Sequence, residues 1–436
     1  MALTGRAVLL VLCGFVALAL APSGATVRWW VLAVAALVTL DLLLAPRTAT
    51  LAIARGTTPP LRRFDDGASP LEVTNTGRRR VRAVLRDAWV PSAGAHETRH
   101  RLDLAPGATE AVATRLRPTR RGDRPADRVT VRTAGPLGLA WRQRSTPIGG
   151  SVRVLPEFAS RRHLPDLMSR LRDIEGRAVV RVRGRGSEFD SLRDYVEGDD
   201  VRSIDWRATA RRRDTVVRTW RPERDRRVVI VLDTSRTSAA RVGDAPRLDT
   251  GIEATLLLAA VAAGAGDAID VVAGDQVVRA RVTDARRGQV LPRCSEAVAP
   301  LQPALVEANW PALVAAATGG ARPRSLVVLV TALDPVTVQE GLLPVLPALL
   351  RRHAVVLAST RDPELERLAR GVGTGQDGGR ADDAYLAAAA QHDLDERERT
   401  AHVLRRLGVD VVDAEPEDAP RVLAEHYLQL KDLGRL

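Results

Sequence analysis

Lysine is almost absent from this chain: of its 65 lysine and arginine residues, only Lys431 is a lysine. A P-loop requires a lysine directly after its glycines to reach the phosphates of a bound nucleotide. No lysine stands in such a position, so the sequence excludes a P-loop ATPase.

Cysteine is scarce as well. Cys13 lies inside an apolar run and Cys294 lies in the C-terminal half, in unrelated surroundings. Two isolated cysteines predict neither a disulfide framework nor a cysteine-rich zinc cluster.

The net charge of +12 is therefore carried by arginine. An arginine bias combined with many alanines is typical of a GC-rich coding sequence, which weakens any inference from charge to a nucleic-acid partner. The 436 residues, 45% of them hydrophobic, are enough for packed cores. A chain of this length predicts about two or three domains.

Long apolar runs are confined to the N-terminus, where Ala7–Ala21 and Val27–Ala45 follow one another across a short turn. About 20 residues are needed to cross the hydrocarbon of a bilayer, so the first run spans it only with adjoining residues. A cleaved signal peptide is the alternative for the first run, but the second run directly behind it argues against that reading. We expect a transmembrane helical hairpin over residues 1–47.

The flanking charges predict how this hairpin is oriented. Arg6 precedes the pair and Arg47 and Arg55 follow it, whereas the loop offers only Arg28 at its edge. The positive-inside rule then predicts a two-pass protein of the cytoplasmic membrane with the bulk of the chain in the cytoplasm. Asp41 is expected near the cytoplasmic end of its helix, where a charge costs little; a functional intramembrane carboxylate is the alternative.

Two further domains are predicted from periodicity. Residues 48–150 alternate with period two between Pro and Gly turns, which indicates a small β-sandwich. Residues 227–436 contain short β-branched runs at 227–232 and 325–331 that alternate with helical segments, which indicates a doubly wound α/β domain with a mostly parallel sheet covered on both faces. Among the helices expected there are one at about 247–264 and one that contains Pro344 and Pro347.

The sequence His96-Glu97-Thr98-Arg99-His100 matches the HExxH pattern of zinc hydrolases. On a helix both imidazoles would share one face and bind zinc, with the glutamate as base. In a strand the two histidines would lie about 13 Å apart, too far to share an ion. Because the motif lies among predicted strands, a chance match is favoured, and a zinc-dependent hydrolase remains the alternative.

The segment 151–226 joins the two domains and contains a dense mixture of charges and aromatics. Only fourteen aromatic residues (7 Trp, 4 Phe, 3 Tyr) occur in the chain, and four lie here: Phe189, Tyr195, Trp206 and Trp220. The arginine-rich 183–186 (RGRG) raises nucleic-acid binding as an alternative. Carboxylates interleaved throughout would repel phosphates, so a folded network of ion pairs is expected and nucleic acid is not.

A third pattern follows the buried run 227–232, where Asp233, Ser235 and Thr237 stand at alternate positions, and Asp334 follows the second buried run. The carboxyl ends of parallel strands are where α/β sheets bind ligands, and these are hard oxygen ligands suited to Mg²⁺. The alternative is that Asp233 and Ser235 cap a turn.

The charged segment carries a signature that resembles the bacterial domain of unknown function 58 family, G-x-G-x-E-F-x-x-L-R-x-Y-x-x-G-D-D-x-R-x-I-D-W-x-A-x-A-R. The matching positions expected to form an interaction surface are Glu188, Phe189, Arg193, Tyr195, Gly198, Asp199, Asp200, Arg202, Asp205, Trp206 and Arg211. The resemblance implies a transmembrane hairpin, a β-rich region and a von Willebrand factor A-like domain with an ion site.

That ion site would use Asp233, Ser235, Thr237 and Asp334, but the threonine expected from a second loop has no clear counterpart, since 301–317 offers only Glu307 and Asn309. A weakened Mg²⁺ site is therefore expected. The family is often encoded beside MoxR-type AAA+ ATPases, so the resemblance implies a non-enzymatic, membrane-anchored adaptor with such an ATPase as partner.

Overall fold

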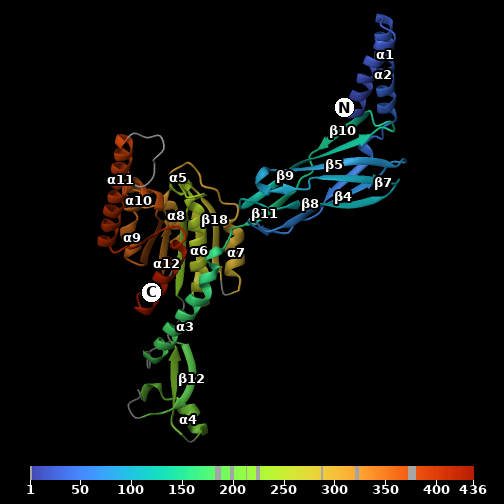
Figure 1. Cartoon of the computed structure of the whole chain (residues 1–436). Helices are drawn as coiled ribbons and strands as arrows, with labels where there is room; N and C mark the ends of the chain where they lie inside the picture. Colours follow the sequence, from blue (N-terminus) through green and yellow to red (C-terminus); the bar gives the residue numbers. More distant parts are fainter. Residues whose placement is uncertain are drawn as a thin grey trace. The chain divides into compact units, whose positions relative to one another are not determined.

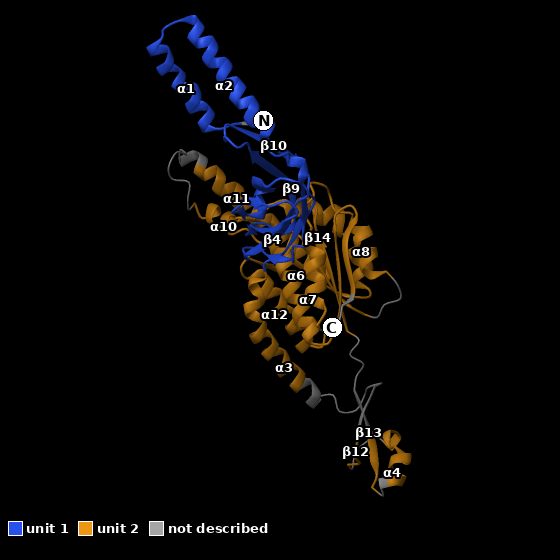
Figure 2. Cartoon of the chain, turned by 90° about the vertical axis from the view of Figure 1, so that its right-hand side faces the viewer, with its two compact units in different colours: residues 1–157 blue, residues 158–436 orange. Residues whose placement is uncertain are grey.

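The computed structural model describes residues 2–181, 188–196, 201–212, 214–221, 226–285, 288–319, 324–371 and 380–436. The chain forms two compact units, Met1–Glu157 and Phe158–Leu436 (Figure 2). The first contains the apolar helices and a β-rich region, and the second contains the α/β sheet, as the periodicity predicts.

Two apolar helices, α1 (Gly5–Leu20) and α2 (Gly24–Leu44), run side by side at the start of the first unit (Figure 1). Among the described residues, α2 is the helix that is long and apolar enough to cross a membrane, while α1 is apolar but shorter. The two helices approach closely because Gly14 has no side chain; a Cβ there would clash with the ring of Trp30.

Asp41 attaches α2 to the β-rich region. Its side chain is fully buried and accepts hydrogen bonds from the backbone N–H groups of Leu137 (2.7 Å), Leu139 (2.7 Å) and Ala140 (2.9 Å). A Cβ on Gly135 would clash with this carboxylate, so the turn must carry glycine there. Asp41 lies in the last turn of α2, near the helix end as the sequence predicts, and its carboxylate serves there as a buried structural acceptor.

The β-rich region consists of two largely antiparallel sheets with a common core. One sheet follows the order β1-β10-β9-β11-β3, with β5 paired to β9 and β7, and the other follows β2-β4-β8-β6. Alternate residues of the strands point inward, such as Leu71 and Val73 from one sheet and Leu85 and Val131 from the other. The strands are β1 (Ala2–Leu3), β2 (Leu51–Arg55), β3 (Leu61–Arg62), β4 (Gly67–Asn75), β5 (Val81–Trp89), β6 (Ala95–His96), β7 (Arg99–Leu104), β8 (Thr109–Leu116), β9 (Gly122–Ala134), β10 (Ala140–Thr146) and β11 (Ser151–Leu155), with short 3₁₀ turns at Thr48–Thr50 (η1) and Pro91–Ala93 (η2).

The second unit is built on a six-stranded sheet in the order β18-β17-β14-β19-β20-β21, parallel except for the edge strand β18. Both faces are covered because strand residues alternate: Val228, Ile230 and Leu232 point to one core, and Val229 and Val231 to the other. The strands of this sheet are β14 (Arg227–Asp233), β17 (Ala268–Gly274), β18 (Val278–Ala285), β19 (Leu326–Val330), β20 (Ala354–Thr360) and β21 (Asp410–Ala414).

Helices on either face supply the rest of each core. One face carries α3 (Leu164–Arg181), α6 (Arg247–Gly264), α7 (Val290–Val298) and α12 (Ala419–Asp432). The other carries α8 (Trp310–Thr318), η5 (Thr337–Leu342), α9 (Leu346–Leu350) and α11 (Arg380–Leu407). The remaining short elements are η3 (Ala159–His163), α5 (Arg236–Ala239), β15 (Arg241–Val242), β16 (Ala245–Pro246) and α10 (Pro363–Ala369).

One predicted helix is divided in two. The sequence predicts a single helix containing Pro344 and Pro347, whereas the structure has a π-helical turn, η5, that ends before Pro344 and a new helix, α9, that begins beside Pro347. Proline lacks the N–H needed inside a helix but is tolerated in the first turn, so the chain restarts there.

The signature segment contains two strands and two short helical elements. Strands β12 (Glu188–Asp194) and β13 (Val216–Arg221) pair antiparallel, and η4 (Val201–Ser203) and α4 (Trp206–Arg212) lie between them in the chain. Val216 and Val217 are buried.

Candidate functional site

The candidate site lies where the strand order of the parallel sheet changes direction. From β14 the chain first adds β17 on one side and later returns to add β19 on the other. Helices leave the sheet in opposite directions at such a point, which opens a crevice at the carboxyl ends of the two strands. Asp233 ends β14 and Thr331 directly follows β19, so both residues border this crevice.

The Asp233 carboxylate is the centre of a buried hydrogen-bond network. Its Oδ1 accepts the backbone N–H of Ser235 at 2.7 Å, and its Oδ2 accepts the hydroxyls of Thr237 at 2.9 Å and Thr331 at 2.6 Å. The hydroxyl oxygens of Ser235 and Thr237 are 3.3 Å apart. All four residues are buried, so three of the four predicted ligands, together with Thr331, form one cluster.

Asp334, the fourth predicted ligand, is held by other groups. Its Oδ1 accepts the backbone N–H of Thr337 at 2.8 Å and lies 3.9 Å from the guanidinium of Arg236. Arg236 is also bonded through Nε to Glu307, and this pairing raises the pKa of Arg236. The permanently charged Arg236, which lies within the Asp233–Thr237 segment, is therefore next to Asp334.

A second buried carboxylate supports the cluster from the next strand. Asp275 accepts the hydroxyl of Thr234 at 3.1 Å and the Nε of Arg279 at 3.0 Å. Burial by itself would raise the pKa of Asp275, but the hydrogen bonds from Arg279 and Thr234 outweigh it, so the pKa lies below its usual range. Asp275 remains a carboxylate that fixes the loop after β14.

A cavity of about 20 Å³ lies beside Asp233 and Thr331. A water molecule needs about 10–15 Å³ of such space, so the cavity has room for a single water or ion. Arg247 lines it and donates from Nη1 to the carbonyl of Thr237 at 2.9 Å, while its buried Nε has no partner among the described residues. Burial lowers the pKa of Arg247 from its ordinary value.

These residues fit a hard cation through one carboxylate and several hydroxyl groups. The described residues contain no group of three or more His, Cys, Asp or Glu side chains that could hold a metal. Asp233, Ser235, Thr237 and Thr331 together supply carboxylate and hydroxyl oxygens, the ligand type that Mg²⁺ prefers. Arg236 competes for Asp334, so any Mg²⁺ would be bound mainly by the buried cluster.

One member of the buried cluster, Thr331, is not among the residues that the sequence predicts. The search for a threonine in 301–317 fails because Asn309 caps α8 through Ala312 N and Glu307 pairs with Arg236. Thr331 supplies the missing hydroxyl instead. Its position at the end of the neighbouring buried strand was the available signal, since ends of adjacent parallel strands share one edge of a sheet.

The HExxH residues do not lie on a helix. His96 is in β6, which pairs with β8, and His100 is in β7, which pairs with β5 in the other sheet. Glu97 between them has a positive φ of 53°. The Nε2 of His100 lies 3.2 Å from the Thr114 hydroxyl, a contact that is structural. The helical geometry on which the zinc alternative depends is therefore absent.

The signature residues lie in several elements, and three of them cannot be described. Gly198, Asp199 and Asp200 lie outside the described residues. Glu188, Phe189 and Arg193 belong to β12, Tyr195 follows it, and the exposed Arg202 and Arg211 lie in η4 and α4.

Two signature residues show clear roles. Asp205 begins α4, because its carboxylate accepts the N–H groups of Arg207 (3.0 Å) and Ala208 (2.9 Å). Trp206, one of the residues expected to form an interaction surface, is 69% exposed.

A search of curated proteins found no match. Among solved structures, the chain is similar to an ASH/PapD-like domain of human CEP192, with 16% identity, a TM-score of 0.20, and 24% of this chain and 87% of that chain covered. It is also similar to a CARDB domain from Pyrococcus furiosus, with 15% identity, a TM-score of 0.19, and coverage of 24% and 91%. Neither likeness establishes a shared fold. Residues 191–379, which include much of the signature and most of the α/β sheet, match the family described as Protein of unknown function DUF58, and this match supports the family that the signature resembles.

Proposed function

We propose that this protein is a membrane-anchored, non-enzymatic adaptor that works with a MoxR-type AAA+ ATPase in the assembly or maturation of protein complexes. The observation that carries the proposal is the exposure of Trp206 within the family signature. An exposed tryptophan at a fixed position is a typical hot spot of a protein interface.

The surroundings of Trp206 support a docking role. Val196 and Val201 are also exposed, at 62% and 63%, so three large apolar side chains of the segment face solvent. Asp205 fixes the start of α4 and thereby the position of Trp206. An apolar group held in place by a polar scaffold gains affinity because little freedom is lost on binding.

The α/β unit is proposed to be von Willebrand factor A-like, with Mg²⁺ bound by Asp233, Ser235, Thr237 and Thr331 and a weaker contribution from Asp334. The buried cluster at the strand switch point supports this assignment. Mg²⁺ should then raise the melting temperature of the full chain by mass action. Asp233→Ala should lose that increment, and Arg236→Gln should enlarge it by removing the competing cation. A wild-type melting temperature that is constant across millimolar Mg²⁺ would leave Asp233 as a turn cap only.

The helical pair is proposed to cross the membrane twice, with the remaining chain in the cytoplasm. Both ends of the helical pair are attached to the hairpin formed by β9 and β10. Strand β1, which precedes α1, pairs with Ala140 and Trp141 of β10, and Asp41, near the end of α2, binds the turn before β10. This arrangement supports entry and exit on one side, and the arginines before and after the pair support the cytoplasmic side. A cytoplasm-dependent reporter fused after Leu436 should be active; activity of an export-dependent reporter alone would refute the orientation.

The docking proposal is tested by capture of the ATPase. Trp206→Ala should abolish binding of the purified MoxR-type ATPase to the full chain while the melting temperature stays unchanged, because the ring contributes little to the fold. Tyr385→Ala is the matched control, since Tyr385 is 78% exposed on α11, outside the signature. Equal capture by wild type and Trp206→Ala would refute docking through Trp206.

A further inference from the structure

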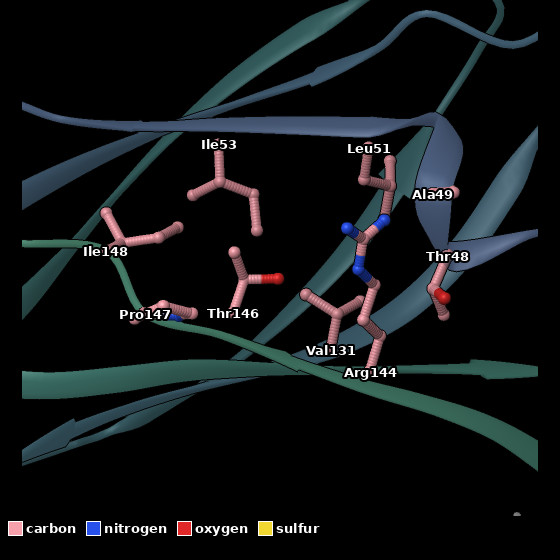
Figure 3. A pocket seen from close by; sticks show the side chains of 9 residues that line it. All are labelled: Thr48, Ala49, Leu51, Ile53, Val131, Arg144, Thr146, Pro147 and Ile148. Carbon is pink, nitrogen blue, oxygen red and sulfur yellow. The ribbon is translucent and has the colours of Figure 1, made fainter.

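The β-rich region contains a pocket of about 440 Å³ between its two sheets. Its walls come from the edge strand β2, the strands β9 and β10, and the residues just after β10 (Figure 3). Leu51, Ile53, Val131 and Ile148 give the pocket an aliphatic side, and Thr48, Arg144 and Thr146 add polar groups to its lining. The volume falls within the range of about 300–1,000 Å³ that is typical of small-molecule sites.

One cation is placed against this apolar surface. Arg144 and Thr146 occupy alternate positions of β10 and both line the pocket, so they share the face of the strand that borders it, where the Arg144 side chain is exposed to solvent. Figure 3 shows the Arg144 side chain reaching across the pocket toward Leu51. Among the described residues, no hydrogen bond or ion pair occupies its guanidinium, in contrast to Arg55, which is bonded to Asp87 in the same region.

The pocket begins immediately after the helix that is able to span a membrane. Thr48 lines the pocket and opens η1, four residues beyond Leu44 at the end of α2. Arg142 on β10 donates through Nε to the carbonyl of Leu42 at 3.0 Å, and Thr133 donates to the carbonyl of Pro46 at 2.8 Å. The strands that form the pocket are therefore bonded directly to the C-terminal end of α2.

We propose that this pocket binds a single-chain anionic amphiphile taken from the bilayer, with the acyl chain against the aliphatic walls and the anionic head on Arg144. The aliphatic side of the pocket favours the chain, and an unpaired guanidinium favours a carboxylate or phosphate, to which it donates two parallel hydrogen bonds. The source of the ligand rests on the proposed membrane anchoring, whereas the pocket itself does not.

Strand β1 pairs with Ala140 and Trp141 of β10, so Arg144 lies beyond this pairing. An arginine at such a place in a sheet has another known use. Such a charge discourages other strands from pairing with the edge. That role requires no ligand. Direct binding of a defined probe therefore distinguishes the amphiphile proposal from a role of Arg144 in preventing strand pairing.

The experiment uses the full chain in nanodiscs of neutral phosphatidylcholine that contain a photoreactive palmitate analogue with a diazirine on its chain. We expect crosslinks in peptides that cover residues 48–53 and 144–148. A lysophosphatidate analogue distinguishes a phosphate head from a carboxylate head, and strong labelling by either supports the proposal. The corresponding alcohol, which has no charge, should label these peptides about tenfold less, because one charge-assisted hydrogen-bonded contact is lost.

Two variants locate the site. Arg144→Gln should reduce labelling by the palmitate analogue about tenfold, as the alcohol does. Arg132→Gln is the matched control, because Arg132 is exposed on the opposite face of the neighbouring strand β9 and should label like wild type. Ala49→Trp should block the pocket, and an unchanged melting temperature would show that it folds.

Labelling confined to α1 and α2, or equal labelling by palmitate and the alcohol, would overturn the proposal. Undiminished labelling of Arg144→Gln would overturn it as well. If the chain is not recovered in nanodiscs, the membrane-anchor proposal fails, and the same labelling of the chain with palmitate in aqueous buffer still tests the pocket.

Discussion

Replacing Asp41 by asparagine tests how the apolar helices are attached to the β-rich region. The carboxylate accepts three backbone N–H groups, with Leu137 on Oδ1 and with Leu139 and Ala140 on Oδ2. Asparagine has the same size but a single acceptor oxygen. The amide oxygen of asparagine can accept the two hydrogen bonds from Leu139 and Ala140. The amide NH₂ group then faces the N–H of Leu137, and two donors cannot form a hydrogen bond with each other.

The magnitude follows from these three bonds. Two hydrogen bonds change from a charged to a neutral acceptor, and each change removes about 1 kcal/mol of stability. The third N–H, that of Leu137, loses its acceptor. This loss costs about 1 kcal/mol, near the low end of the range for an unsatisfied polar group, because Leu137 is partly exposed. The total is about 3 kcal/mol, a large fraction of the stability of a typical domain. For a unit of this size it corresponds to a fall in melting temperature of about 6–12 °C.

The measurement is the melting temperature of the full chain in detergent, followed by tryptophan fluorescence. Asp66→Asn is the control, because Asp66 is exposed and lies in the same unit. Limited proteolysis of Asp41→Asn should show new cleavage in the turn at 135–140. A variant that melts with wild type and resists cleavage there would refute a structural role for Asp41 and revive the intramembrane functional alternative.

Three other predictions follow from buried polar groups. Asp87→Ala should destabilise the β-rich unit by about 3–5 kcal/mol in chemical denaturation, because Arg55 is buried and bonded to Asp87 at 2.6 Å and would be left unpaired; Asp103→Ala, at an exposed pair, should have little effect. Burial and the charge of Arg352 lower the pKa of His353, whose Nδ1 accepts a hydrogen bond from the backbone N–H of Ser325. As the pH falls below about 6.5, the unfolded chain therefore binds a proton at His353 before the folded chain does, and the free energy of unfolding decreases. His353→Asn should flatten this part of a stability–pH profile, and a slope identical to that of wild type would refute the prediction. Burial raises the pKa of the Cys294 thiol to about 12, so in a Cys13→Ser background a thiol reagent at pH 8 should react only after denaturant is added, and rapid reaction of the folded chain would contradict the packing of α7.

Much of the architecture was predictable because it depends on local periodicity. The continuous apolar runs predict helices, and α2 does meet the requirements for a membrane span. Period-two alternation predicts the β-rich region, and the run 227–232 predicts a strand buried on both faces, which β14 is. The α6 helix has the bounds that its sequence predicts, 247–264. Each of these signals is complete within about ten to twenty residues, so no distant contact is needed to read it.

The tertiary structure decided which side chains meet. Asp41 binds N–H groups 96 to 99 residues away, and Thr331 binds Asp233 across 98 residues, so neither partner is visible in a local pattern. The exposure of Trp206 also depends on the tertiary structure, because burial is set by which surfaces pack together. Arg144 likewise reads as one arginine among many in an arginine-rich chain. Only the alternation of β10 and the aliphatic residues contributed by β2 and β9 place it in a pocket close to the end of α2.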